Sequence, residues 1–242
     1  MGEALNGKIM EHLSQPAKRL IVCVAAVAWV VVVTALLEWN GGHLLKLAIW
    51  LLVAALAGTV KLRFPAVDSC YSLGYIVVLA GMSMLGFSDL VLVSLVTALV
   101  QCYWHASKRP MAVQLVFNLG NYAISAAVSW YAFRALGYLD PDLSIPARFT
   151  LGAGVFFLIN TGLVSWILAL LAGKRLMEIW EKSHLLIFPF YLIGAGCAAM
   201  VAWQQGAVGW SILAVLPLLF LAIASLRSCF HVLLAISQRL SS

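Results

Sequence analysis

The chain has 242 residues, of which 64% are hydrophobic and only 10% are charged, and it carries a formal net charge of +6. Because a soluble domain of this length carries about 25% charged residues, the composition excludes a water-soluble fold for most of the chain. The cysteines are scattered and form no CxxC pair, which argues against a disulfide framework and against a metal–thiolate site.

Apolar runs follow one another along almost the whole sequence. They cover residues 20–38, 44–61, 71–87, 89–105, 111–134, 149–172, 186–204 and 208–226. A turn signal at Gly86 to Asp89 divides the third run from the fourth, because one helix of ~34 residues would overshoot a ~30 Å hydrocarbon core. The sequence therefore predicts an all-α fold: a polytopic integral membrane helix bundle of about eight transmembrane helices.

The basic residues give this bundle an orientation. With eight spans, one side of the membrane receives Lys8, Lys18, Arg19, Lys61, Arg63, Lys108, Arg109, Lys174, Arg175, Lys182, Arg227 and Arg239, and the other receives Lys46, Arg134 and Arg148. Cytoplasmic loops carry the excess of Lys and Arg, so both termini are predicted to be cytoplasmic. The predicted location is the bacterial inner (plasma) membrane, crossed many times.

Three regions follow from these spans. Residues 1–19 form a cytoplasmic N-terminal segment, residues 20–226 a single transmembrane helical domain, and residues 227–242 a cytoplasmic C-terminal helix. On the cytoplasmic side, residues 173–186 place Leu176, Ile179 and Trp180 on one helical face, which predicts an interfacial amphipathic helix.

Ionisable side chains avoid the middle of every span. Proton-coupled pumps, ion exchangers and voltage sensors generally need such a group at depth, so these classes are disfavoured. The histidines lie at span ends or outside, and no GxSxG, HExxH or paired-aspartate motif occurs. We therefore predict that the protein is not an enzyme, with no catalytic residues, no metal and no cofactor.

Amides take the place of ionisable groups. Gln114, Asn118 and Asn121 share one face of the fifth span, and Asn160 and Thr161 lie near the middle of the sixth, less than two turns from Trp166. At 1.5 Å per residue, Asn121 and Asn160 lie roughly 15 Å and 18 Å from the cytoplasmic surface. If the two helices are neighbours, these amides can meet near the midplane.

Three interpretations of the amides remain open. They can be hydrogen bonds that hold helices together, the polar groups of a ligand pocket, or side chains that wet a pathway. On the pocket interpretation the ligand-binding residues are Asn118, Asn121, Asn160, Thr161, Gln114 and Trp166.

Three stretches also carry a resemblance to a known family. "LRFPAVDSCYSLGYIVVLAGMSMLG" (62–86), "FNLGNYAIS" (117–125) and "FFLINTGLVSWILAL" (156–170) resemble the membrane-embedded N-terminal sensory module of bacterial GGDEF and HD-GYP signalling proteins. The resemblance covers about residues 60–225. It implies a multi-helix sensor, with Asn118 and Asn160 at the matching motif positions, but no output domain follows in this sequence. The chain would then be a fragment, act through a separate partner, or have been recruited to another role.

Together these observations predict a non-enzymatic membrane sensor that couples a small molecule in the bundle to a cytoplasmic partner. The alternatives are a substrate-binding or transport subunit of a membrane transporter and a structural accessory subunit of a membrane complex. The predicted partners are the lipid bilayer, a small amphipathic or apolar ligand, and a cytoplasmic or membrane protein. No nucleic acid is expected.

Overall fold

The computed structural model describes residues 13–64, 67–104, 106, 109–183 and 187–203, which form eight α-helices and one two-stranded sheet. In chain order the elements are α2 (Gln15–Leu37), α3 (Leu44–Thr59), β1 (Lys61–Phe64), β2 (Val67–Ser72), α4 (Gly74–Met84), α5 (Phe87–Tyr103), α6 (Ala112–Leu139), α7 (Ile145–Ala172), α8 (Leu176–Ser183) and α9 (Phe188–Trp203). The chain divides into two compact units, Met1–Ala202 and Trp203–Ser242. The described residues belong almost entirely to the first.

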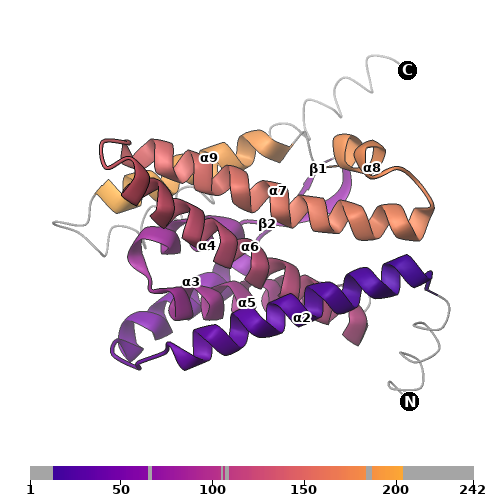
Figure 1. Ribbon diagram of the computed structural model, residues 1–242, viewed down its shortest axis with the longest axis horizontal. Helices are drawn as coiled ribbons and strands as arrows, with labels where there is room; N and C mark the ends of the chain where they lie inside the picture. Colours follow the sequence, from indigo (N-terminus) through magenta and orange to yellow (C-terminus); the bar gives the residue numbers. More distant parts are fainter. Residues whose placement is uncertain (1–12, 65–66, 105, 107–108, 184–186, 204–242) are drawn as a thin grey trace, which may run out of the picture. The chain divides into compact units, whose positions relative to one another are not determined.

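Helix α6 lies at the centre of the first unit. It packs against α2, α5 and α7, and α5 in turn packs against α3 and α4 (Figure 1). The approach of α2 to α6 depends on Gly120, where an added Cβ would lie 3.1 Å from both Ala28 Cβ and Val24 Cγ1. Small residues allow such close backbone contact between apolar helices. Gly120 therefore sets how closely α2 and α6 approach each other.

The outer surface of the bundle is apolar. On α2, Trp29 is 70% exposed and Leu37 is 82% exposed, and large exposed apolar side chains recur on α3, α6 and α7. Apolar surface of this extent is unusual on a soluble monomer and is typical of contact with a membrane or a partner. By length and composition, α2 and α7 can each cross a membrane, whereas α3, α4, α5 and α9 are apolar but shorter.

Six of the predicted apolar runs each overlap one long observed helix, namely α2, α3, α5, α6, α7 and α9, and the third run overlaps the short α4. Helix α2 begins before its predicted run because Ser14 caps it. The Ser14 Oγ accepts a hydrogen bond from the Ala17 backbone N–H at 3.4 Å, and Pro16 occupies the first turn. The eighth predicted span, 208–226, and the C-terminal helix, 227–242, lie outside the described residues.

The third predicted run differs from the structure. β1 and β2 form an antiparallel hairpin in which Lys61 lies opposite Ser72, so the run predicted to begin at residue 71 starts in a strand. After the hairpin the Ser72 Oγ accepts from the Gly74 backbone N–H at 3.1 Å, and α4 that starts there has only 11 residues. The predicted turn before Asp89 is confirmed, since α4 ends at Met84 and Gly86 precedes α5.

Candidate functional site

The first group of polar side chains joins α6 to α7. The Asn121 Nδ2 donates to the side-chain oxygen of Asn160 at 2.6 Å and to the Asn160 backbone carbonyl at 3.1 Å. Asn121 is buried and Asn160 is half-buried. The depth estimate made from the sequence therefore pairs the correct residues, because the two amides meet across the α6–α7 interface.

Two further side chains extend this pair into a chain of hydrogen bonds. Asn160 Nδ2 donates to the Tyr191 hydroxyl on α9 at 3.1 Å, and Ser125 Oγ donates to Asn121 Oδ1 at 3.4 Å. Ser125 and Tyr191 are both buried. Since a buried polar group without a partner costs ~1–3 kcal/mol, these bonds favour one relative position of α6, α7 and α9.

Aromatic rings enclose this chain of hydrogen bonds. Tyr191 stacks on Tyr75 of α4 with ring centroids 4.4 Å apart, and it meets Phe157 edge-on at 5.1 Å. The Tyr75 hydroxyl donates to the backbone carbonyl of Phe190 at 2.7 Å. Hydrogen bonds in such an apolar environment are electrostatically stronger than in water. For Asn121 and Asn160, this is the geometry that the helix-packing interpretation requires.

Thr161 takes part in a separate contact between α7 and α8. Its Oγ1 donates to the Phe157 backbone carbonyl at 2.6 Å and accepts from the Trp180 indole Nε1–H at 2.9 Å. The Trp180 ring also lies 5.8 Å from the Phe157 ring. The amphipathic helix predicted within residues 173–186 is present as α8, and its tryptophan is tied to α7 by this bond.

Removing this bond is expected to weaken the attachment of α8. Trp180→Phe keeps an aromatic ring against Phe157 but loses the N–H donor, so the free energy of unfolding should fall by about 0.5–1.5 kcal/mol. Thermal unfolding in detergent of Trp180→Phe, Thr161→Val and the double variant measures the coupling. If the two single losses simply add up, the bond contributes nothing.

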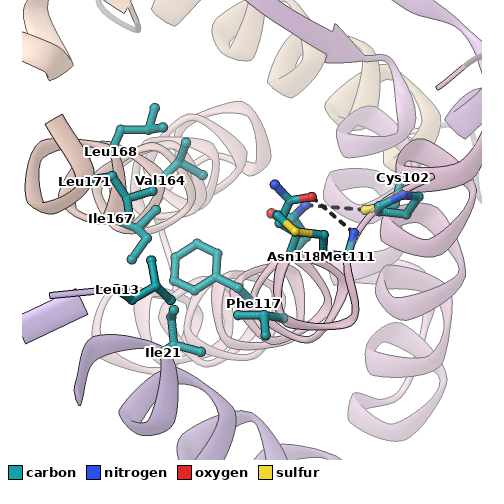
Figure 2. Close-up of a pocket in the computed structure, with 13 residues that line it drawn as sticks. Leu13, Ile21, Cys102, Met111, Phe117, Asn118, Val164, Ile167, Leu168 and Leu171 are labelled. Atoms are coloured by element: carbon teal, nitrogen blue, oxygen red, sulfur yellow. Dashed lines mark hydrogen bonds between the residues drawn. The ribbon is translucent and has the colours of Figure 1, made fainter. Parts of the chain in front are cut away.

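A cavity lies at another place, between the start of α2, the start of α6 and the end of α7. It measures about 440 Å³. Its lining residues are Leu13, Ile21, Cys102, Pro110, Met111, Val113, Gln114, Phe117, Asn118, Val164, Ile167, Leu168 and Leu171. Figure 2 shows the side chains of Ile21 and Ile167 facing Phe117, with Asn118 and Cys102 on the opposite side of that ring. The cavity is therefore mainly apolar, with a short polar edge.

Two predicted site residues form that polar edge. Asn118 Nδ2 donates to Cys102 Sγ at 3.4 Å, and Gln114 Oε1 accepts from the Met111 backbone N–H at 3.2 Å. Within the part of the chain that the structure describes, no hydrogen bond reaches the Asn118 side-chain oxygen or the Gln114 side-chain nitrogen. The Asn118 oxygen, the second Asn118 N–H and the Gln114 N–H groups thus remain available at the cavity.

Positive charge flanks the cavity along the sequence. The residues concerned are Lys18 and Arg19 in α2, Arg109 beside the lining residue Pro110, and Lys174 and Arg175 just beyond Leu171. All except the half-buried Lys18 are exposed. No acidic side chain lines the cavity, and the described residues contain no group of three or more His, Cys, Asp or Glu that could hold a metal ion. The surroundings therefore favour an anion.

The six predicted residues consequently fall in different places. Asn121 and Asn160 bond each other, Thr161 bonds Trp180, and Gln114 and Asn118 line the cavity. Trp166 is 49% exposed and belongs to none of these groups. Sequence reasoning missed Tyr191 and the apolar lining; the charged helix ends on either side of the cavity were the available signal for the latter.

The comparisons with known proteins give one match to part of the chain. It is 34% identical over 87 residues to the undecaprenyl-diphosphatase of Azotobacter vinelandii (strain DJ). The matched segment covers 36% of this chain and 27% of that protein, so the chain spans little more than a quarter of the relative's length. No protein-family model matches the chain, and no solved structure matches it significantly.

This similarity corrects three predictions. The resemblance to GGDEF and HD-GYP sensory modules is wrong, because the relative is a diphosphatase. The predictions of a non-enzymatic sensor and of no enzyme are wrong on the same ground, and neither the transport subunit nor the accessory subunit matches such a relative. The prediction of no enzyme rested on the absence of known hydrolase motifs and of ionisable groups at span centres, whereas the charged groups of this chain lie at helix ends.

Proposed function

We propose that the chain is a membrane-embedded phosphatase that acts on a polyprenyl diphosphate. The observation that carries the proposal is the similarity to undecaprenyl-diphosphatase over 87 residues. A polyprenyl chain is apolar and resides in the bilayer, so an enzyme that acts on it needs apolar helices beside a site for the diphosphate. The apolar outer surface of α2 and the cations beside the cavity fit both needs.

The proposed reaction is hydrolysis of the terminal phosphate. A water oxygen bonds to the terminal phosphorus while the bond from that phosphorus to the bridging oxygen breaks. The bridging oxygen keeps the electron pair, and the products are the polyprenyl monophosphate, inorganic phosphate and one proton at neutral pH. Exposed cations such as Arg109 and Arg175 would stabilise the negative charge on the phosphates.

The finer topology is part of the same proposal. We propose eight transmembrane helices with both termini cytoplasmic, in the bacterial inner membrane, with residues 20–226 as the membrane domain. The support is that helix ends which the distribution of Lys and Arg (the charge rule) assigns to the same side of the membrane contact one another. Leu13, Met111 and Leu171 line one cavity although they lie at three different helix ends, all assigned to the cytoplasm.

Contacts at the opposite ends of the helices agree with this assignment. Lys46 Nζ donates to the Met84 backbone carbonyl at 2.6 Å, and Trp130 Nε1 donates to the Leu85 carbonyl at 3.4 Å. All four residues belong to ends or turns that the charge rule assigns to the outside. The two groups of contacts therefore support the alternation of helix directions.

Cysteine labelling tests the topology. In a variant without native cysteines, Ser144→Cys in the outer connection should react with a membrane-impermeant maleimide on intact cells. Lys174→Cys, which is also at an exposed position, should react only after the cells are opened. Equal reaction of both on intact cells would contradict the assignment of these two loops.

Phosphate release tests the activity. Protein purified in detergent should release inorganic phosphate from farnesyl diphosphate, a soluble short-chain probe, and from undecaprenyl diphosphate. Arg109→Gln should lower kcat/KM about tenfold, corresponding to ~1.4 kcal/mol, because Arg109 adjoins the cavity. Arg134→Gln is the matched control, since this exposed cation lies against Trp130 on α6. Absence of phosphate release with either substrate would overturn the proposed function.

A further inference from the structure

We infer that the cavity between α2, α6 and α7 holds the first part of the prenyl chain, with Asn118 and Gln114 contacting the end that carries the diphosphate. The inference rests on the proposed function, because it takes the lipid diphosphate from that proposal and assigns it a binding site.

The lining of the cavity has the polarity that such a molecule needs. The walls are side chains such as Phe117, Val164 and Ile167, and the polar edge holds the Gln114 amide N–H groups and the second N–H of the Asn118 amide, beside the one that Cys102 accepts. A donor such as the Gln114 amide can bind a phosphate oxygen, whereas the walls offer a prenyl chain only apolar contacts. Ligand sites commonly combine an apolar pocket with a few polar groups that fix orientation.

The length and volume of the cavity also fit part of a chain. From Ala172 at the end of α7 back to Val164 the helix rises ~12 Å, so a diphosphate near the helix end would leave its tail directed toward Val164. The volume of about 440 Å³ lies within the usual range of ~300–1,000 Å³ for small-molecule sites. Several isoprene units fit, and the remainder of a long chain would extend into lipid.

The other group of amides is a weaker candidate for this role. Asn121 and Asn160 satisfy each other, and Tyr191 and Ser125 take up their remaining groups. A ligand there would first have to break buried hydrogen bonds. At the cavity, by contrast, the available amide atoms need no such rearrangement.

Filling the cavity tests the inference. Leu168→Trp adds bulk to a lining position, and Leu158→Trp adds the same bulk to an exposed position on α7 outside the lining. We expect Leu168→Trp to weaken farnesyl diphosphate binding at least tenfold by native mass spectrometry and to raise KM for phosphate release. Leu158→Trp should change neither. Gel filtration and thermal unfolding confirm that each variant is folded.

A second variant tests the polar edge of the cavity, and it also tests the inference if Leu168→Trp does not fold. Asn118→Leu has nearly the same volume but no acceptor or donor, so it should weaken binding of farnesyl diphosphate and leave binding of farnesol unchanged. Inorganic pyrophosphate alone should bind poorly to wild type, because it lacks the apolar part. Equal binding of pyrophosphate and farnesyl diphosphate would overturn the role of the cavity.

The outcomes separate the two proposals. Phosphate release that neither variant alters would overturn the cavity assignment and leave the proposed function standing. Farnesyl diphosphate binding that both variants weaken, without phosphate release by any form, would overturn the proposed function and support the cavity as a site for a lipid diphosphate. Weaker farnesyl diphosphate binding together with a raised KM for phosphate release, in the lining variants alone, supports both proposals.

Discussion

Replacing Gly74 by Ala is expected to lower the free energy of unfolding by about 1–3 kcal/mol, the usual cost of extra bulk in a packed interior. A Cβ at this position would overlap Thr97 Cγ2 on α5 and would lie 3.2 Å from Ser72 Oγ. Thr97 cannot easily turn away, because it is fully buried and its Oγ1 donates to the Val93 carbonyl at 2.8 Å.

The position of Gly74 in the chain increases the expected loss of stability. It follows the β1–β2 hairpin, and Ser72 Oγ contacts both the Gly74 N–H and the Gly58 carbonyl. Any shift that relieves the overlap with Thr97 must therefore also disturb the junction of α3, the hairpin and α4. A clash confined to one flexible side chain would cost less.

Thermal unfolding in detergent, read by gel filtration after heating, measures this change. Gly154→Ala is the matched control, because nothing lies within 4 Å of a Cβ there and the residue is inside α7. Alanine in a helix interior should leave stability unchanged or raise it by roughly 0.5–1 kcal/mol. Similar destabilisation by both changes would show that packing at Gly74 is not the cause.

Hydrophobic length predicted most of the helices but not the hairpin. An apolar run of about twenty residues is long enough to span the bilayer only as a helix, and α2 and α7 follow that rule. The region around residues 61–72 forms strands that end where Ser72 pairs with Lys61. The composition does not indicate where the second strand ends, because the apolar character continues from β2 into α4.

The candidate site was predictable where one helix or one interface decides the geometry. The shared face of Gln114 and Asn118 follows from helix periodicity, and the meeting of Asn121 with Asn160 follows from equal depth on adjacent helices. The part played by Tyr191 depends on where α9 packs, which no local pattern encodes. The exposure of Trp166 likewise depends on which face of α7 meets its neighbours.

The similarity to a diphosphatase was not foreseen from the sequence, for a different physical reason. The absence of ionisable groups at span centres bears only on chemistry at the midplane of the membrane. In the proposed function the diphosphate would stay near the water interface and meet cations at helix ends, where Arg109 and Lys174 lie. The sequence prediction used these cations only to orient the chain in the membrane, and their capacity to bind an anion was not considered.

Asn121→Asp is expected to be the most destabilising of the substitutions considered for the polar groups. The two side chains have nearly the same shape, but the carboxylate has no N–H to donate. Its oxygens would face the Asn160 side-chain oxygen and backbone carbonyl, which lie 2.6 Å and 3.1 Å from the present donor. In the proposed topology Asn121 lies near the centre of a membrane helix, where a charged Asp costs about 2.5–3.5 kcal/mol, and repulsion from these oxygens adds to that cost.

Asn121→Leu is the comparison that gives this measurement its meaning. Leucine introduces no charge but leaves the Ser125 hydroxyl and the Asn160 oxygen without their partner, so its cost should be ~1–3 kcal/mol. Thermal unfolding in detergent at neutral pH should rank wild type above Asn121→Leu and both well above Asn121→Asp. Equal stability of the two variants would mean that water reaches the pair, which contradicts its burial.

The same two variants decide which interpretation of the amides holds at this interface. If Asn121 and Asn160 only hold helices together, Asn121→Leu should keep its phosphate release in proportion to the fraction that remains folded. A folded Asn121→Leu protein that binds farnesyl diphosphate normally but has lost phosphate release would place the pair at the reacting group instead. Asn118 lies three residues earlier on the same helix face. Phosphate release by Asn118→Leu, measured in parallel, therefore shows whether a loss of activity is specific to Asn121.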